Sequence, residues 1–123
     1  MTLPHHSLVV WQRADDLFID LHKLTLKAFP SFERFELGSQ TRRAAYSVAA
    51  NIVEGVAREH TREKLRFLNT SRSSLAEVGY CVHVAKRLGY INQVRFKELD
   101  LLIRGVGAAL TGYVRAVKEG RTV

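Results

Sequence analysis

The chain has 123 residues, of which 46% are hydrophobic and 25% are charged, a composition typical of a globular protein rather than a disordered one. Its net charge is +7, and its single cysteine excludes an intramolecular disulfide and a multi-cysteine zinc site. No apolar run reaches 18 residues, so we expect no membrane span, and a membrane is not among the partners that we expect. We expect one domain over residues 1–123.

Apolar residues recur at helical spacing in four segments. We predict helices at about residues 8–28, 39–58, 61–89 and 92–118. Both prolines lie in the first 30 residues, so the rest of the chain is free to form long helices. Because short connections between long amphipathic helices favour antiparallel neighbours, the predicted fold is all-α, an up-down-up-down antiparallel four-helix bundle.

The connection after the first helix is indicated by two residues. Pro30 disfavours helical geometry at the residue before it, and Gly38 permits a turn. We expect Phe32, Phe35 and Leu37 to pack over one end of the bundle. Ser39 is the expected N-cap of the second helix.

The second helix has a polar stripe that is separate from its apolar face. Arg43, Ser47, Asn51 and Glu54 lie within an arc of roughly 80°. Buried polar groups need partners, so one interpretation is a hydrogen-bonded network that fixes helix register or a subunit interface. The other is a ligand or RNA contact. We favour the structural interpretation because a carboxylate in the stripe opposes phosphate binding.

The helix predicted at 61–89 carries an apolar stripe that includes Phe67. Ser71 and Ser74 are interpreted as packing hydroxyls, since no nucleophile motif surrounds them. Cys81 has no base at helical spacing and is interpreted as a small buried apolar residue. This helix therefore shows no reactive group.

The helix predicted at 92–118 begins at Asn92, a favourable N-cap. Away from its core face it carries Gly105, Ala108 and Gly112 at helical spacing. Small side chains let a second backbone approach, so we interpret this stripe as an oligomer interface. The alternative is that the glycines only loosen the helix.

Catalytic and metal sites are not expected. The five histidines are scattered and none stands three residues after a glutamate, which argues against the ligand pattern of a di-iron bundle. No phosphate-binding loop or nucleophile elbow is present. We therefore expect a non-enzymatic protein with no cofactor, no metal and no catalytic residue; an enzyme would need a cleft with perturbed titratable groups.

The basic excess falls in the second half of the chain, where residues 59–89 and 90–123 each hold six basic and three acidic residues. This charge fits a polyanion, nucleic acid (RNA or DNA) first and an anionic membrane second. The alternative is a solvated surface that keeps a small protein in solution. The expected phosphate contacts are Arg42, Arg58, Arg62 and Arg66, the last three at four-residue steps. Aromatic residues are not interleaved with them, so sequence-specific reading of single strands is not expected.

A longer motif spans the second helix. It reads Gln40-x-Arg42-Arg43-Ala44-Ala45-x-Ser47-Val48-x-x-Asn51-Ile52-x-Glu54-Gly55. Together with Val10-Trp11-x-x-Ala14 upstream and Leu88-Gly89-Tyr90-Ile91 downstream, it resembles the bacterial four-helix-bundle family of 23S ribosomal RNA intervening-sequence proteins. The resemblance covers about residues 8–91. Val53 and Ser73 replace the commoner Ala and Gly, which affects helix packing rather than membership.

The resemblance implies a ring-like homopentamer in the bacterial cytoplasm with no assigned enzymatic activity. Some family members are encoded inside insertions of the large-subunit ribosomal RNA gene. A distant relative, the accessory variability determinant of diversity-generating retroelements, works with a reverse transcriptase and nucleic acid. For this chain the resemblance implies that the polar stripe holds structural or interface residues.

Two functions follow as hypotheses. The first is an oligomeric helical protein that associates with nucleic acid, or with a nucleoprotein, through a basic surface. The second is a protein–protein interaction scaffold with no nucleic-acid role, whose partner docks on apolar or small-residue faces.

Overall fold

A computed structural model describes residues 3–121 of the chain. These residues form four α-helices and two short 3-10 helices, with no strand. In chain order the elements are η1 (Pro4–Ser7), α1 (Val9–Lys27), η2 (Ser31–Glu33), α2 (Leu37–Ala57), α3 (Thr61–Arg87) and α4 (Gln93–Lys118). The predicted all-helical class and the four helices are confirmed.

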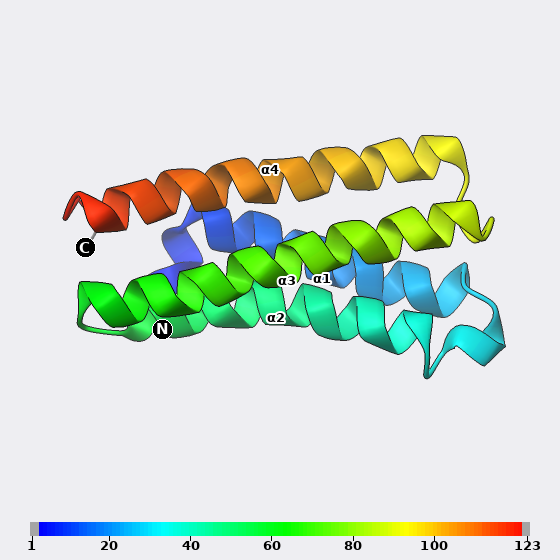
Figure 1. Cartoon of the computed structure of the whole chain (residues 1–123), viewed down its shortest axis with the longest axis horizontal. Coiled ribbons are helices and arrows are strands. Elements are labelled where there is room, and N and C mark those ends of the chain that lie inside the picture. The colour runs from blue at the N-terminus through cyan, green and yellow to red at the C-terminus, as the bar shows by residue number, and fades with distance from the viewer. Residues whose placement is uncertain (1–2, 122–123) are drawn as a thin grey trace.

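The four helices lie side by side along the long axis of the molecule, and their connections lie at alternate ends (Figure 1). Each helix contacts the next one in the chain, and α1 also contacts α4. One apolar core runs between them, and its largest fully buried side chains include Leu17, Ile52, Leu68, Leu99 and Leu110. Burying a leucine side chain of this kind contributes about 1.5–3 kcal/mol to folding. Within residues 3–121, no helix combines the length and hydropathy that crossing a bilayer requires.

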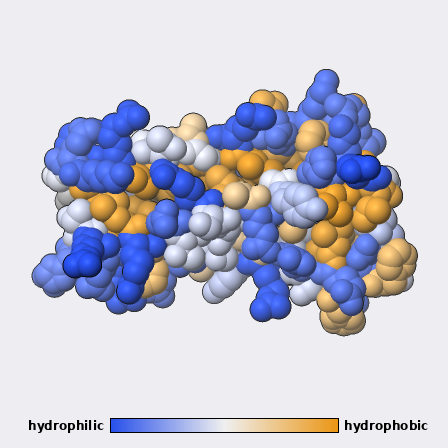
Figure 2. Space-filling model, in the orientation of Figure 1, coloured by the Kyte–Doolittle hydropathy of each residue, from blue (hydrophilic) through white to orange (hydrophobic). Residues whose placement is uncertain are grey.

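The surface on the side shown in Figure 2 alternates between apolar and hydrophilic patches. Leu101 and Tyr80 are among the large apolar side chains that stay exposed, at 71% and 67%. Single exposed apolar side chains are common on the surfaces of monomeric proteins. Several patches along one molecule leave surface available for contacts with other molecules.

The start of α2 differs from the prediction. The helix begins at Leu37 rather than Ser39, and Ser39 is therefore not its N-cap. The capping group comes from upstream, because the Glu33 carboxylate (Oε1) accepts the Leu37 backbone N–H at 3.2 Å. The side chain of a residue four positions earlier thus satisfies a helix N–H that would otherwise lack a partner.

Gly38 lies inside α2 and does not form the predicted turn. A Cβ atom at this position would lie 2.8 Å from the backbone oxygen of Glu33, so only glycine lets the helix pass over that carbonyl. Of the three residues expected to cover this end, Leu37 packs against the core, but the expectation was wrong for Phe32 and Phe35, which are 72% and 83% exposed. Phe29 is buried near this end instead, with its ring 5.4 Å from the ring of Tyr90.

The connection between α3 and α4 follows the sequence signals closely. Gly89, just after α3, has φ of +80°, the left-handed conformation that glycine adopts without strain. Asn92 is the N-cap of α4, since its side-chain oxygen accepts the Arg95 N–H at 2.8 Å. Between them, the Tyr90 hydroxyl donates to Glu33 Oε2 at 2.6 Å, which joins this turn to the η2 connection.

The end of α2 and the start of α3 approach each other closely. A Cβ atom at Gly55 would lie 3.3 Å from both the Lys64 carbonyl oxygen and Phe67 Cβ. Across the same turn, the Lys64 ammonium donates to the Val56 carbonyl oxygen at 3.0 Å. A cation from α3 thereby satisfies one of the free carbonyl groups at the C-terminus of α2.

Replacing Gly38 by alanine should destabilise the fold by about 1–3 kcal/mol, because the new methyl group overlaps a backbone oxygen that cannot move freely. Gly79→Ala is the matched control, since a Cβ at Gly79 meets nothing within 4 Å. That change should stabilise the protein by about 0.5–1 kcal/mol. Urea denaturation measures both changes, and equal effects would contradict the close approach at Gly38.

Candidate functional site

The polar stripe of α2 divides into parts with different partners. Ser47 Oγ and Ser74 Oγ of α3 are hydrogen-bonded at 2.7 Å. Asn51 Nδ2 donates to the Ser47 backbone oxygen at 2.8 Å and to Ser47 Oγ at 3.0 Å. Glu54 points elsewhere and forms an exposed ion pair with Arg58, one turn away. The stripe therefore brings Ser47 and Asn51 together at the α2–α3 contact and leaves Glu54 outside that network.

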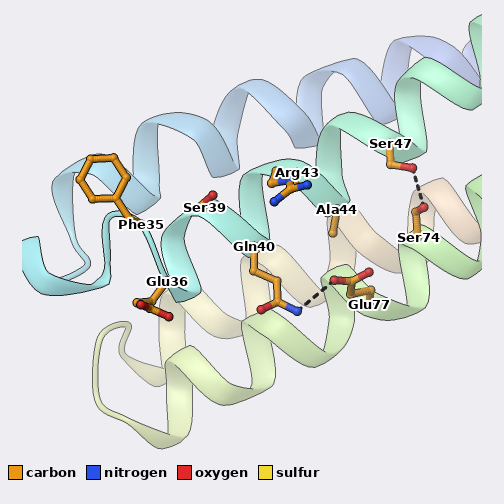
Figure 3. A pocket seen from close by; sticks show the side chains of 9 residues that line it. All are labelled: Phe35, Glu36, Ser39, Gln40, Arg43, Ala44, Ser47, Ser74 and Glu77. Carbon is orange, nitrogen blue, oxygen red and sulfur yellow. Dashed lines mark hydrogen bonds between the residues drawn. The ribbon is translucent and has the colours of Figure 1, made fainter.

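A polar hollow of about 590 Å³ lies at the η2 end of this contact (Figure 3). Arg43 and Ser47 of the predicted stripe line it. Figure 3 shows Gln40 reaching from α2 to Glu77 on α3, where its Nε2 donates to Oε2 at 3.3 Å. Sequence reasoning did not assign a site role to Gln40 or Glu77. Their pairing depends on how α2 lies against α3, which helical periodicity does not specify.

The packing role predicted for two serines of α3 is confirmed. Ser71 is fully buried and its hydroxyl donates to the Val48 carbonyl oxygen at 2.7 Å. Ser74 forms the bond to Ser47 described above. Each hydroxyl joins α3 to α2 and has a defined partner, so neither is placed as a free nucleophile.

Arg42 is committed to contacts inside the chain. Its Nη1 donates to Thr25 Oγ1 at 2.9 Å, and its Nη2 donates to the Arg34 backbone oxygen at 2.8 Å. These bonds connect α2 with α1 and with the segment after η2. The guanidinium therefore acts as a tie between elements. It also lies 16 residues before Arg58, roughly 24 Å away along the helix, so the four predicted phosphate contacts are not one patch.

Arg58 and Arg66 are brought to the same aromatic ring at the turn between α2 and α3, and Arg62 lies between them in the chain, in the first turn of α3. We call these three residues the basic turn. The guanidinium carbon of Arg58 lies 4.7 Å from the centre of the Phe67 ring, and that of Arg66 lies 5.4 Å from it. Phe67 is only partly buried, so the predicted core position describes only part of its role. It holds two cations in place by cation–π attraction.

The small-residue stripe of α4 faces away from the core of its own chain. Ala108 and Gly112 are exposed and Gly105 is half-buried. Added Cβ atoms at Gly105 and Gly112 meet nothing within 4 Å. The nearby contact is polar, from Arg13 Nη1 to the Gly105 carbonyl oxygen at 3.2 Å. The stripe is open for contact with another backbone.

Titratable groups in the described part of the chain do not gather into a reactive cluster. Burial raises the pKa of the Cys81 thiol, so it is protonated at neutral pH. Among residues 3–121, no three side chains of His, Cys, Asp or Glu are placed to hold a metal ion.

The sequence of the chain matches a known protein family. The model of the 23S rRNA-intervening sequence protein family matches residues 6–112. The chain belongs to this family. The predicted resemblance is thus confirmed at the level of the family, and the match extends beyond the motif of α2 to reach well into α4. A comparison with curated proteins finds no match to the chain.

In this member of the 23S rRNA-intervening sequence protein family, the Ser47–Ser74 bond can be tested by a double-mutant cycle. Each single change to alanine should cost about 0.5–1.5 kcal/mol of unfolding free energy. The double variant should cost less than the sum by about 0.5–1 kcal/mol, because either single change already removes the hydrogen bond between the two hydroxyls. Urea denaturation gives all the values.

Thr70→Ala is the control for this cycle. The Thr70 hydroxyl is exposed and bonds within its own helix, to the Arg66 carbonyl oxygen. Its removal should change stability by less than about 0.5 kcal/mol. Strictly additive costs for Ser47 and Ser74 would show that the two hydroxyls do not act as a pair.

Proposed function

We propose that this protein is a non-enzymatic, self-associating helical bundle that binds nucleic acid, RNA or DNA, through the basic turn. The observation that carries the proposal is the convergence of Arg58, Arg62 and Arg66 at one turn. Membership of the 23S rRNA-intervening sequence protein family is consistent with an RNA partner. A free, buried cysteine is consistent with the cytoplasm, where RNA resides.

The basic turn supports phosphate binding by its exposure and charge. Arg62 and Arg66 are exposed, and within residues 3–121 neither one forms an ion pair. Arg58 pairs with Glu54, so part of its charge is already neutralised. Positions at four-residue steps on one helix face suit successive phosphates. Arg62 and Arg66 are therefore the main contacts in this proposal, and Arg42 is the least suited.

The proposed arrangement of the helices is up-down-up-down and antiparallel. Alternating connections in Figure 1 and the contact of α1 with α4 support this order. We extend the proposal to the homopentamer that the family resemblance implies, assembled through the α4 stripe. The proposed relation to the accessory variability determinant of diversity-generating retroelements rests on the same resemblance.

A protein–protein scaffold is the second candidate function. The exposed apolar side chains on α3 and α4, Tyr80 and Leu101 among them, favour it. A pull-down experiment distinguishes the two functions. The partners of a scaffold are still captured after nuclease treatment, whereas partners that depend on nucleic acid are lost.

Arg62→Gln should weaken binding to a 20-nucleotide RNA and to a 20-base-pair DNA duplex. The plot of log affinity against log salt has a negative slope. Removing one phosphate contact should make that slope less negative by about 0.7 for the single strand and about 0.9 for the duplex. Fluorescence anisotropy over about 50–300 mM salt measures the slope. An affinity that does not change with salt would reject binding through phosphates.

Arg87→Gln is the matched control for this experiment. It removes the same charge from an exposed arginine of α3, about 38 Å along the helix from Arg62. If binding uses the basic turn, the control keeps the wild-type slope. Equal effects of the two changes would show that only the net charge of the protein matters.

Gly112→Leu should weaken self-association and leave helicity unchanged. The monomer has room for the side chain, so the effect falls on a partner backbone. Thr111→Leu is the control, because Thr111 is exposed on the same helix but outside the stripe. Analytical ultracentrifugation with circular dichroism checks the result. An unchanged assembly in the Gly112 variant would remove the α4 stripe from the proposal.

A further inference from the structure

A second groove, with a volume of about 270 Å³, lies between α1 and α2, and Glu54, the ion-pair partner of Arg58, lines its end nearest the basic turn. On α1 it is lined by Trp11, Asp15 and Phe18, which follow each other at i, i+4 and i+7 and so share one helix face. On α2 the lining includes Tyr46 and Glu54. We call this the aromatic groove.

Aromatic rings form much of its wall. The ring of Phe18 on α1 lies 5.7 Å from the ring of Tyr46 on α2, edge to face at 70°. Trp11 is held from the other side, because the His5 ring of η1 lies 4.7 Å from its ring. Between the walls, α2 contributes Ala49 among other short side chains, which leaves the space open.

The charged residues that line the aromatic groove are both acidic, on a chain whose net charge is +7. Asp15 is half-buried, and no hydrogen bond or ion pair to its carboxylate occurs within residues 3–121. Glu54 forms an exposed ion pair with Arg58. A phosphate would meet like charge in this groove, whereas a cation would meet an available carboxylate.

We propose that the aromatic groove binds an arginine side chain presented by a basic helix of a partner protein. The guanidinium pairs with Asp15 and stacks on an aromatic ring, which attracts a cation within about 6 Å of its centre. The aliphatic part of the side chain packs against the other rings. From Trp11 to Phe18 the groove covers two helical turns, about 10 Å, which suits one or two side chains of a docked helix.

The test uses an acetylated alanine–glutamine helical peptide with one arginine, and the same peptide with citrulline, its neutral isostere. Trp11 is the only tryptophan of the chain, so its fluorescence reports occupation of the groove. We expect a saturable change with the arginine peptide. The citrulline peptide should bind about 5-fold more weakly, the ratio that corresponds to about 1 kcal/mol.

Two matched variants locate the contact. Asp15→Asn should weaken binding of the arginine peptide about 5-fold. Asp16→Asn removes the same charge from the adjacent exposed carboxylate, which lies outside the groove, and should change the affinity less than about 2-fold. Tyr46→Ala, at a side chain that is 61% exposed and so not needed for the core, should also weaken binding.

Three results would overturn the proposal. These are equal binding of the arginine and citrulline peptides, equal effects of the Asp15 and Asp16 changes, and a lower sedimentation coefficient of the Asp15 variant in the absence of peptide. The last result would mean that a second copy of this chain occupies the groove. Nucleic-acid binding of the same variants separates this proposal from the basic turn, because neither aspartate belongs to that turn.

Discussion

The close contact between α2 and α3 is the constraint on which the other features depend. Most of the buried residues of α2 are small, and at Gly55 α2 lies so near α3 that even a methyl group would be crowded. At this separation the short hydroxyl groups of Ser47 and Ser74 reach each other, and that of Ser71 reaches a backbone carbonyl of α2. Larger residues on α2 would separate these groups and leave them without partners.

The same contact sets the chemistry of the two ends. At one end it closes the turn tightly enough for Arg58 and Arg66 to lie over the same phenylalanine ring. At the other end the helices carry longer polar side chains and leave the hollow crossed by Gln40 and Glu77. Basic and mixed polar surfaces are thus separated along one pair of helices. In the proposed function, only the first of these two surfaces contacts the phosphates of a nucleic acid.

Much of the fold could be predicted from the sequence, because amphipathic periodicity is a local property. The stripes of apolar residues predicted both ends of α1 to within one residue. The expected N-cap at Asn92 predicted the start of α4 correctly. The start of α2 could not be predicted in the same way. It depends on Glu33 reaching forward and on Gly38 passing over a carbonyl, and neither interaction has a periodic signal.

The candidate site was harder to predict than the fold because its members come from different helices. Four-residue spacing placed Arg62 and Arg66 on one face of α3, and that inference needed only helix geometry. Arg42 looked equally available in the sequence. Its bonds to Thr25 and to the Arg34 carbonyl depend on how α1 and η2 lie against α2. The aromatic groove combines a face of α1 with a face of α2 for the same reason.

The Tyr90–Glu33 hydrogen bond has a consequence for how the bundle opens. One carboxylate accepts from the first turn of α2 and from the loop that precedes α4, so it joins two connections that are 57 residues apart. If the hydrogen bond between Tyr90 and Glu33 breaks, both connections lose it at the same time. Local unfolding at that end therefore involves both loops as one cooperative unit, and their amide protons exchange with solvent together.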